Sequence, residues 1–166
     1  MALIDGMLQE FEQETQTTRR VLERVPDNQL AWRPHEKART LGELALHVAT
    51  VPGAVAELVA SPSPAQAPQF TDPSPKSASE LVPALDRSIA KVKEVLGGMD
   101  DAALTATWRL MHGERELLAM PRVAMLRSVM LNHWYHHRGQ LLVYLRMHDV
   151  PLPSVYGPTA DENPFA

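Results

Sequence analysis

Apolar residues recur at helical spacing in four long segments of the chain, and this periodicity restricts the possible folds more than any other feature. The segments are residues 3–25, 41–60, 78–97 and 122–147, separated by proline or glycine. Two of them open with a capping box, Thr40 with Glu43 and Ser77 with Glu80, in which each side chain bonds the other residue's amide. Because no stretch shows the strict alternation of a strand, the pattern predicts an all-α fold, a four-helix bundle.

The connections between these segments set the expected order of the helices. Residues 61–76 contain five prolines and are too long a connection for a tight antiparallel turn. They predict a long crossover that leaves the second and third helices parallel. Pro52 removes one helical hydrogen bond, so we expect a kink or an early end of the second helix there. Residues 99–120 are mixed in character and could include a short helix at Asp100–Leu104.

Length, charge and cysteine content narrow the class of protein. The 166 residues suit one domain, residues 1–166, with a core large enough to be stable. The absence of cysteine excludes disulfides, thiolate metal sites and a catalytic thiol. The N-terminus lacks the basic start of a signal peptide, and no apolar run approaches the roughly 20 residues that span a bilayer. The net charge is −4 and the Lys and Arg residues are scattered, so we expect no nucleic-acid or membrane partner and predict a cytoplasmic protein.

The last segment places two histidines on its inward stripe. The stripe advances in steps of 4-3-4-3-4 through Leu126, Met130, His133, His137, Gln140 and Tyr144. Residues four apart stack on one side of a helix, so His133 and His137 could bind one ion. The spacing equally fits two hydrogen-bonded core histidines, and both interpretations stay open at this point. Trp134 stands where helical zinc proteases carry a glutamate, so a protease-type general base is missing.

His47 favours the metal interpretation. It lies beside the inward stripe of the second segment, one turn after Glu43 and near Leu44 and Val51. A third imidazole from a facing helix would complete a three-histidine site with open positions, which is the arrangement of catalytic zinc. Alone, His47 would be interpreted as an ordinary boundary histidine. Three imidazoles suit zinc, nickel, iron or copper, and of these divalent metal ions we expect zinc or nickel.

Three segments of the chain resemble one known family. Residues 131–146, LNHWYHHRGQLLVYLR, and residues 30–49, LAWRPHEKARTLGELALHVA, are similar to the paired motifs of the DinB/YfiT-like family. These are the damage-inducible helical proteins, not the DNA polymerase that shares the name. The tail PLPSVYGPTADE is also similar, so the resemblance covers nearly the whole chain. It implies a four-helix bundle in up-down-down-up order, with a divalent metal on His47, His133 and His137.

The resemblance also implies partners and chemistry. The family is commonly dimeric, which implies a homodimer. A segment that the four-helix core does not clearly need supplies apolar residues for such an interface: Leu117, Leu118 and Met120. Characterised relatives include thiol-dependent transferases and isomerases that use bacillithiol, mycothiol or glutathione. The resemblance therefore implies a small-molecule substrate and a low-molecular-weight thiol as cosubstrate.

Other polar residues are weaker candidates for the site. Arg138 and Gln140 could bind a substrate anion or orient a metal ligand, and a surface arginine and a buried packing glutamine are equally compatible interpretations. Glu43 could accept a proton from His47, although its capping role already explains it. These three are the candidate catalytic residues. His136 is expected beside the ligands or at the surface. His112 and His148 are expected at the surface.

Two classes of function are compatible with these residues. The first is a metal-dependent enzyme of the thiol S-transferase type. Three neutral imidazoles leave the ion its full charge, and without cysteine the sulfur nucleophile has to come from a cosubstrate. Hydrolysis by a metal-bound water is the enzymatic alternative. The second class is a non-catalytic metal or small-ligand binding protein associated with stress. A filled, dry site would favour this binding protein. A polar, reachable cavity at the metal would favour the enzyme.

Overall fold

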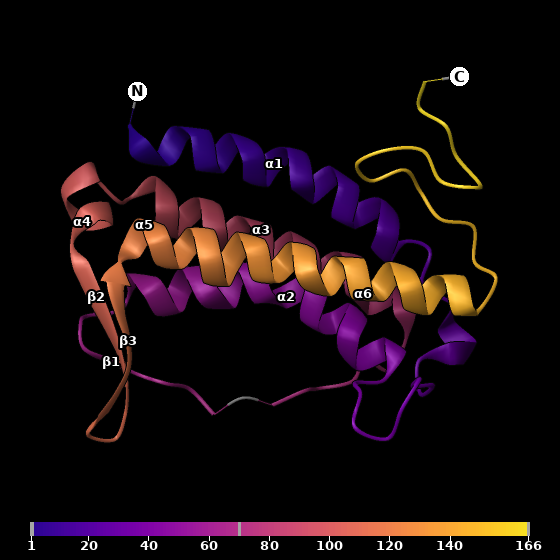
Figure 1. The fold of residues 1–166 in the computed structure, drawn as a ribbon, viewed down its shortest axis with the longest axis horizontal. Coiled ribbons are helices and arrows are strands. Elements are labelled where there is room, and N and C mark those ends of the chain that lie inside the picture. Colours follow the sequence, from indigo (N-terminus) through magenta and orange to yellow (C-terminus); the bar gives the residue numbers. More distant parts are fainter. Residues whose placement is uncertain (1, 70, 166) are drawn as a thin grey trace.

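Helices make up most of the chain, as predicted, and the long helices lie side by side (Figure 1). The computed structural model describes residues 2–69 and 71–165. The long helices are α1 (Leu3–Leu22), α2 (Leu41–Ala60), α3 (Leu81–Gly97) and α6 (His133–Met147). Shorter helical segments are η1 (Asp27–Gln29), η2 (Ala78–Glu80), α4 (Asp101–Thr105), α5 (Arg122–Met125) and η3 (Leu126–Asn132). The hydrophobic core lies between the long helices and includes Phe11, Leu44, Leu85 and Leu141.

A small three-stranded sheet at one end of the molecule contradicts the all-α prediction (Figure 1). Its strands are β1 (Ala65–Gln66), β2 (Thr107–His112) and β3 (Arg115–Pro121). β2 pairs in parallel with β1 and antiparallel with β3, and Gly113 turns the hairpin at a φ of +60°. Trp108 and Leu110 are buried and Arg109 between them is exposed, which is the period of a half-buried strand. The alternation covers only 6 residues, so it does not stand out in the sequence.

Some helix starts and ends differ from the predicted positions. α1 ends at Leu22, short of the predicted end. The predicted capping box at Ser77 is not formed, because its hydroxyl accepts from the Ser79 amide and a 3₁₀ turn precedes α3. The capping box that opens α2 is present. The Glu43 N–H donates to the Thr40 hydroxyl at 3.2 Å, and the Thr40 N–H donates to the Glu43 carboxylate at 2.7 Å.

α2 continues through Pro52 instead of ending there. A proline has no N–H, so the carbonyl of Val48, four residues earlier, loses its helical donor. The indole N–H of Trp134 on α6 donates to this carbonyl at 2.8 Å. The next amide, Gly53 N–H, donates to the Ser88 hydroxyl of α3 at 2.8 Å. Neighbouring helices therefore bind backbone groups around the proline.

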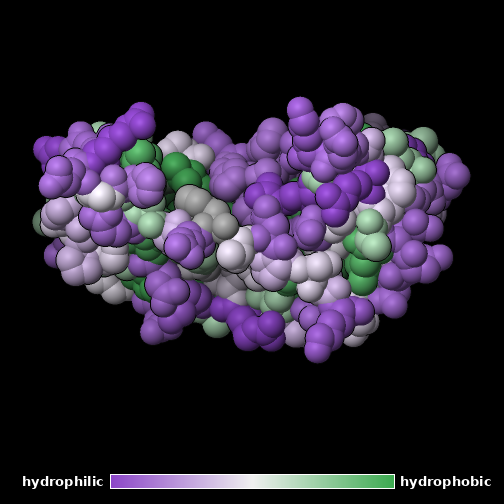
Figure 2. Space-filling model, turned by 90° about the horizontal axis from the view of Figure 1, so that it is seen from below, coloured by the Kyte–Doolittle hydropathy of each residue, from purple (hydrophilic) through white to green (hydrophobic). Residues whose placement is uncertain are grey.

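α2 packs against α3, α6 and η3. By length and composition alone it could cross a membrane, which differs from the expectation that no segment approaches that length. More than half of its apolar stretch is buried inside the protein, as in the core helix of a soluble domain. Figure 2 shows the face along which the described residues of the 61–76 segment run. That face is mostly hydrophilic, with apolar side chains in small, separate patches.

Candidate metal centre

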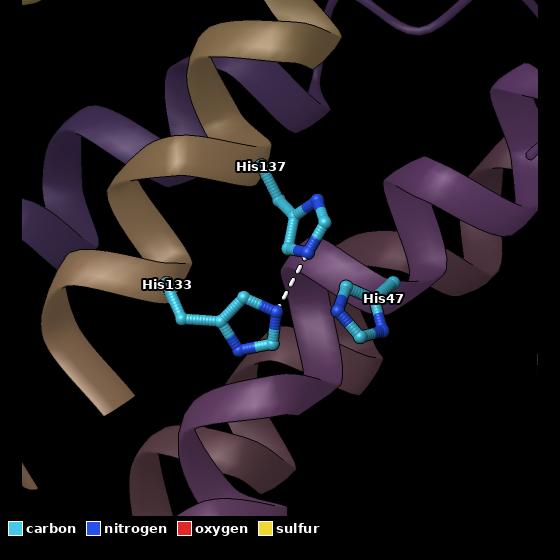
Figure 3. Close-up of side chains that lie close together, drawn as sticks. All are labelled: His47, His133 and His137. Carbon is cyan, nitrogen blue, oxygen red and sulfur yellow. Dashed lines mark hydrogen bonds between the residues drawn. The ribbon is translucent and has the colours of Figure 1, made fainter. Parts of the chain in front are cut away.

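Three histidines from two helices point toward one another (Figure 3). His47 lies on α2, and His133 and His137 lie one turn apart on α6. One ring nitrogen from each lies within 4.8 Å of the other two. The described residues place no fourth His, Cys, Asp or Glu in this group. The structure therefore brings together the three residues that the sequence predicts as metal ligands.

Two of the three rings are hydrogen-bonded to each other. The Nε2 atoms of His133 and His137 are 2.7 Å apart, so one imidazole donates and the other accepts. The ring centres of His47 and His137 are 4.5 Å apart, in an edge-to-face arrangement. One buried nitrogen that faces the other rings, His47 Nε2, has no hydrogen-bond partner among the described residues. An unpartnered buried nitrogen is costly, so the cluster is suited to accept a cation beside His47.

The His133–His137 pair fits a divalent ion after a small adjustment. Imidazole nitrogens bind zinc-like ions at about 2.0–2.1 Å, which in tetrahedral coordination separates two nitrogens by about 3.3 Å. The nitrogens of His133 and His137 would therefore move apart by about half an ångström on metal binding. Three neutral nitrogen donors would leave at least one coordination position open.

Burial keeps the three rings neutral. It lowers the pKa of His47 to about 4, and the positive charge of Arg39 adds to this shift. It also lowers the pKa of His137 to about 4, partly opposed by the hydrogen bond with Gln140. Burial lowers the pKa of His133 as well. Neutral imidazole is the form that binds metal, so at neutral pH these ligands need not lose a proton first.

Gln140 contacts the candidate ligand His137, as its predicted role of orienting a metal ligand requires. Its Oε1 lies 2.8 Å from His137 Nδ1. A carbonyl oxygen accepts, so His137 carries its proton on Nδ1 and presents the lone pair of Nε2 to the cluster. Gln140 is exposed instead of buried, which contradicts the alternative of a packing glutamine. It orients His137 from outside the cluster.

Arg138 is directed away from the histidines, into the interface with α1. Its side chain is 2% exposed, and its Nη2 lies 2.6 Å from the Glu14 carboxylate. The guanidinium also donates to the Thr18 hydroxyl at 3.0 Å and to the Tyr156 hydroxyl at 2.6 Å. It lies over the Tyr135 ring, 5.3 Å from its centre. Both interpretations based on the sequence, an anion contact at the metal and a surface arginine, are therefore corrected: Arg138 ties α6 to α1 and to the C-terminal tail.

The remaining candidates have structural positions. Glu43 is engaged in its capping box, which supports the interpretation that capping explains it. His136 and His112 are exposed, the second at the end of β2. His148 is half-buried, which corrects the expectation of a surface position: its ring packs edge-on against Trp32, with ring centres 4.4 Å apart.

The helix that carries His133 and His137 is interrupted just before them. Leu126–Asn132 forms wider π-helical turns, where the sequence predicts one continuous helix over 122–147. Extra residues in such turns rotate the rest of the helix, so a heptad count from Leu126 does not fix the direction of His133 by itself. Single-turn π-bulges are frequent at functional sites.

A polar cavity of about 390 Å³ adjoins the cluster at His137. Gln140 and Tyr144 of α6 form part of its wall. The rest comes from Leu44 in α2, which the sequence places near His47, and from four residues that no sequence pattern singles out: Lys37, Ala38 and Arg39 before α2, and Asp72 in the proline-rich segment. Arg39 and Asp72 are 33 residues apart and meet only through the fold, so no local sequence pattern could pair them.

Comparison with known proteins places the chain in a family. The sequence profile of the DinB superfamily matches residues 10–141. The uncharacterized protein YrdA of Bacillus subtilis (strain 168) is 27% identical over 160 residues, covering 96% of this chain and 91% of that protein. The crystal structure of a DinB-like protein from Bacillus cereus ATCC 10987 superposes with a TM-score of 0.73 at 27% identity, covering 92% of this chain and 97% of that one. A DinB-like protein of Bacillus subtilis, YjoA, has the same fold, with a TM-score of 0.67 at 20% identity and coverage of 90% and 97%. The chain therefore belongs to the DinB superfamily.

Proposed function

We propose that this protein binds a divalent metal ion on His47, His133 and His137 and is a metal-dependent enzyme of the thiol S-transferase type. The observation that carries the metal proposal is the convergence of three ring nitrogens within 4.8 Å, together with the unpartnered buried Nε2 of His47. The cavity of about 390 Å³ beside His137 supports an enzyme over a closed binding site, because small molecules can reach the cluster.

The chemistry depends on the ligand set. Bound to three neutral imidazoles, the ion would keep its double charge and lower the pKa of a bound thiol or water. The chain has no cysteine, so the sulfur nucleophile would come from a small cosubstrate. Gln140 fixes the tautomer of His137, and burial keeps the three rings neutral. Zinc and nickel are the ions that we propose, and iron or copper would suit the same donors.

The proposal includes the finer points of architecture and location. A bundle in up-down-down-up order is supported by the connection from α2 to α3. The described residues of its 61–76 segment run back along the length of the molecule, so that α2 and α3 point the same way (Figure 1). The packing of α2 as a core helix supports a soluble, cytoplasmic protein. For the homodimer the support is narrower than the sequence suggests. Leu117 is 45% exposed, whereas Leu118 and Met120 pack partly against the core.

Metal content tests the first half of the proposal. Wild-type protein loaded with Zn²⁺ or Ni²⁺ and then desalted should retain one ion per chain. His137→Ala should retain none, because two imidazoles hold the ion far more weakly. His136→Ala is the matched control: it removes the adjacent, exposed imidazole and should leave the metal content unchanged. Equal metal content in wild type and His137→Ala would refute the site.

Turnover tests the second half. Metal-loaded protein is supplied with an electrophilic substrate, with and without bacillithiol, mycothiol or glutathione. Turnover that requires a thiol and is lost in His133→Ala supports the transferase. Thiol-independent turnover that is lost in the same variant identifies a hydrolase acting through metal-bound water. Metal binding without turnover under either condition identifies a non-catalytic binding protein.

A further inference from the structure

The cavity beside His137 carries a charge opposite to that of the whole chain. Its charged wall residues are two cations, Lys37 and Arg39, and one acid, Asp72. The chain as a whole has a net charge of −4. A net positive charge on the walls of a cavity raises the local concentration of anions. A bound divalent ion would make the same cavity more positive still.

Arg39 is the cation best placed to bind an anion there. Its side chain is 32% exposed, and its Nε lies 2.6 Å from Asp72 Oδ1. Its two terminal amino groups have no hydrogen-bond partner within the described part of the chain. A guanidinium offers five N–H donors in a fork that matches the two oxygens of a carboxylate. Its charge also acts on the metal cluster, where it contributes to the lowered pKa of His47.

Asp72 indicates which kind of anion fits. The aspartate belongs to the proline-rich segment and places a carboxylate directly against Arg39, so a carboxylate is compatible with the space there. The Asp72 side chain is 44% exposed, and an exposed ion pair of this kind contributes little to stability. A carboxylate from a ligand can therefore compete with it or join it on the free side of the guanidinium.

We propose that the cavity binds a small organic carboxylate whose carboxylate group contacts Arg39. The other end of the molecule, which reacts, lies at the side of the cavity where His137 joins the metal cluster. This inference rests on the proposed function and names the substrate class of the same site. The cavity volume of about 390 Å³ is in the range of small-molecule sites. Gln140, whose Oε1 is engaged with His137, has its amide N–H groups available on the cavity wall for a second polar contact.

Two thiols that differ only in charge test the anchor. Isothermal titration of Zn²⁺-loaded protein compares 3-mercaptopropionate with its neutral amide. The wild type should bind the carboxylate at least about tenfold more tightly, the effect of one charge-assisted contact. Arg39→Gln should reduce the affinity for the carboxylate about tenfold and leave the amide unchanged. Asp72→Asn, which removes the competing carboxylate, should raise the affinity for 3-mercaptopropionate.

Controls separate the anchor from other effects. Arg33→Gln removes an exposed arginine of the same segment that is outside the cavity wall and should change neither affinity. Arg39→Lys keeps the positive charge but not the forked guanidinium, so it should also lower the affinity for the carboxylate. This variant replaces Arg39→Gln in the test if Arg39→Gln does not fold. A carboxylate preference that survives Arg39→Gln would come from chelation by the metal and would overturn the inference, as would a loss of affinity in Asp72→Asn.

Succinate separates the failure of this inference from the failure of the proposed function. If neither thiol binds the metal-loaded protein, but succinate binds and requires Arg39, the carboxylate site stands and the thiol chemistry falls. If both thiols bind with equal affinity and Arg39→Gln changes nothing, the thiol chemistry stands and the carboxylate anchor is refuted.

Discussion

Trp134→Phe should destabilise the protein mainly by removing one hydrogen bond between α6 and α2. The indole N–H donates to the Val48 carbonyl, which has no helical donor because residue 52 is a proline. Phenylalanine keeps most of the aromatic packing but has no N–H. The side chains of Trp134 and Val48 are fully buried, so water is poorly placed to replace the lost donor.

The expected size of the effect has two parts. An unsatisfied buried carbonyl costs about 1–3 kcal/mol in the free energy of unfolding. The smaller ring leaves a cavity that adds roughly 1–2 kcal/mol. The sum, roughly 2–5 kcal/mol, does not by itself identify the cause, because any cavity in the core would destabilise the protein.

A double-mutant cycle with Pro52→Ala isolates the hydrogen bond. Alanine at this position restores an N–H that can donate to the Val48 carbonyl within α2. In that background Trp134→Phe should cost only its cavity, so its effect should shrink by about 1–3 kcal/mol. The assay is urea unfolding of the metal-free proteins, followed by far-ultraviolet circular dichroism so that the tryptophan substitution does not alter the signal. Effects that add to within about 0.5 kcal/mol would refute this account of Trp134.

Three further predictions concern charge and association. In metal-free protein the pKa of His47 and of His137 is lowered to about 4, whereas histidines of the unfolded chain have a pKa near 6.5. Between these values the unfolded chain binds more protons, so the free energy of unfolding should fall as pH decreases from about 6.5 to 4. His47→Gln should make this pH dependence less steep, as measured by urea unfolding at several pH values. Arg138→Met leaves the Glu14 carboxylate without its ion-pair partner and should lower the free energy of unfolding by about 3–5 kcal/mol in the same assay. The metal content should not change, and a loss of metal would contradict the position of Arg138 away from the histidines. Sedimentation at micromolar concentration should give a dimer that Leu117→Lys weakens, and a wild-type monomer would contradict it.

The sequence predicts the long helices and the three histidines because both depend on local spacing. His133 and His137 are four residues apart, and a helix turns residues at that spacing to the same side. Arg138 comes directly after His137 and is therefore rotated by about 100° around the helix. The same argument that sets His136 apart from the ligands thus applies to Arg138, and it would have directed the guanidinium away from the cluster.

Other parts of the structure depend on contacts that no local pattern contains. The β2–β3 hairpin alternates over too few residues to be distinguished from a loop, and β2 is completed by its pairing with the distant β1. The Arg39–Asp72 pair joins the start of α2 to the proline-rich segment. The π-helical turns of η3 cannot be predicted from heptad spacing, because an α-helical count assumes that they are absent.

The position of Pro52 connects the fold to the candidate site. A three-histidine site with ligands on two helices needs those helices at a fixed separation, since a shift of one against the other changes every distance between His47 and the other two rings. Val48 comes directly after His47, and Trp134 directly after His133, so the hydrogen bond between them joins α2 and α6 beside the ligands. A helix-breaking residue thus provides the free carbonyl that makes this connection possible. Trp134→Phe should therefore weaken zinc binding about tenfold, as loss of a supporting contact does at other metal sites. Competition with a zinc chelator measures this change, and unchanged affinity in a folded Trp134→Phe protein would mean that packing alone holds the two helices at the distance the metal requires.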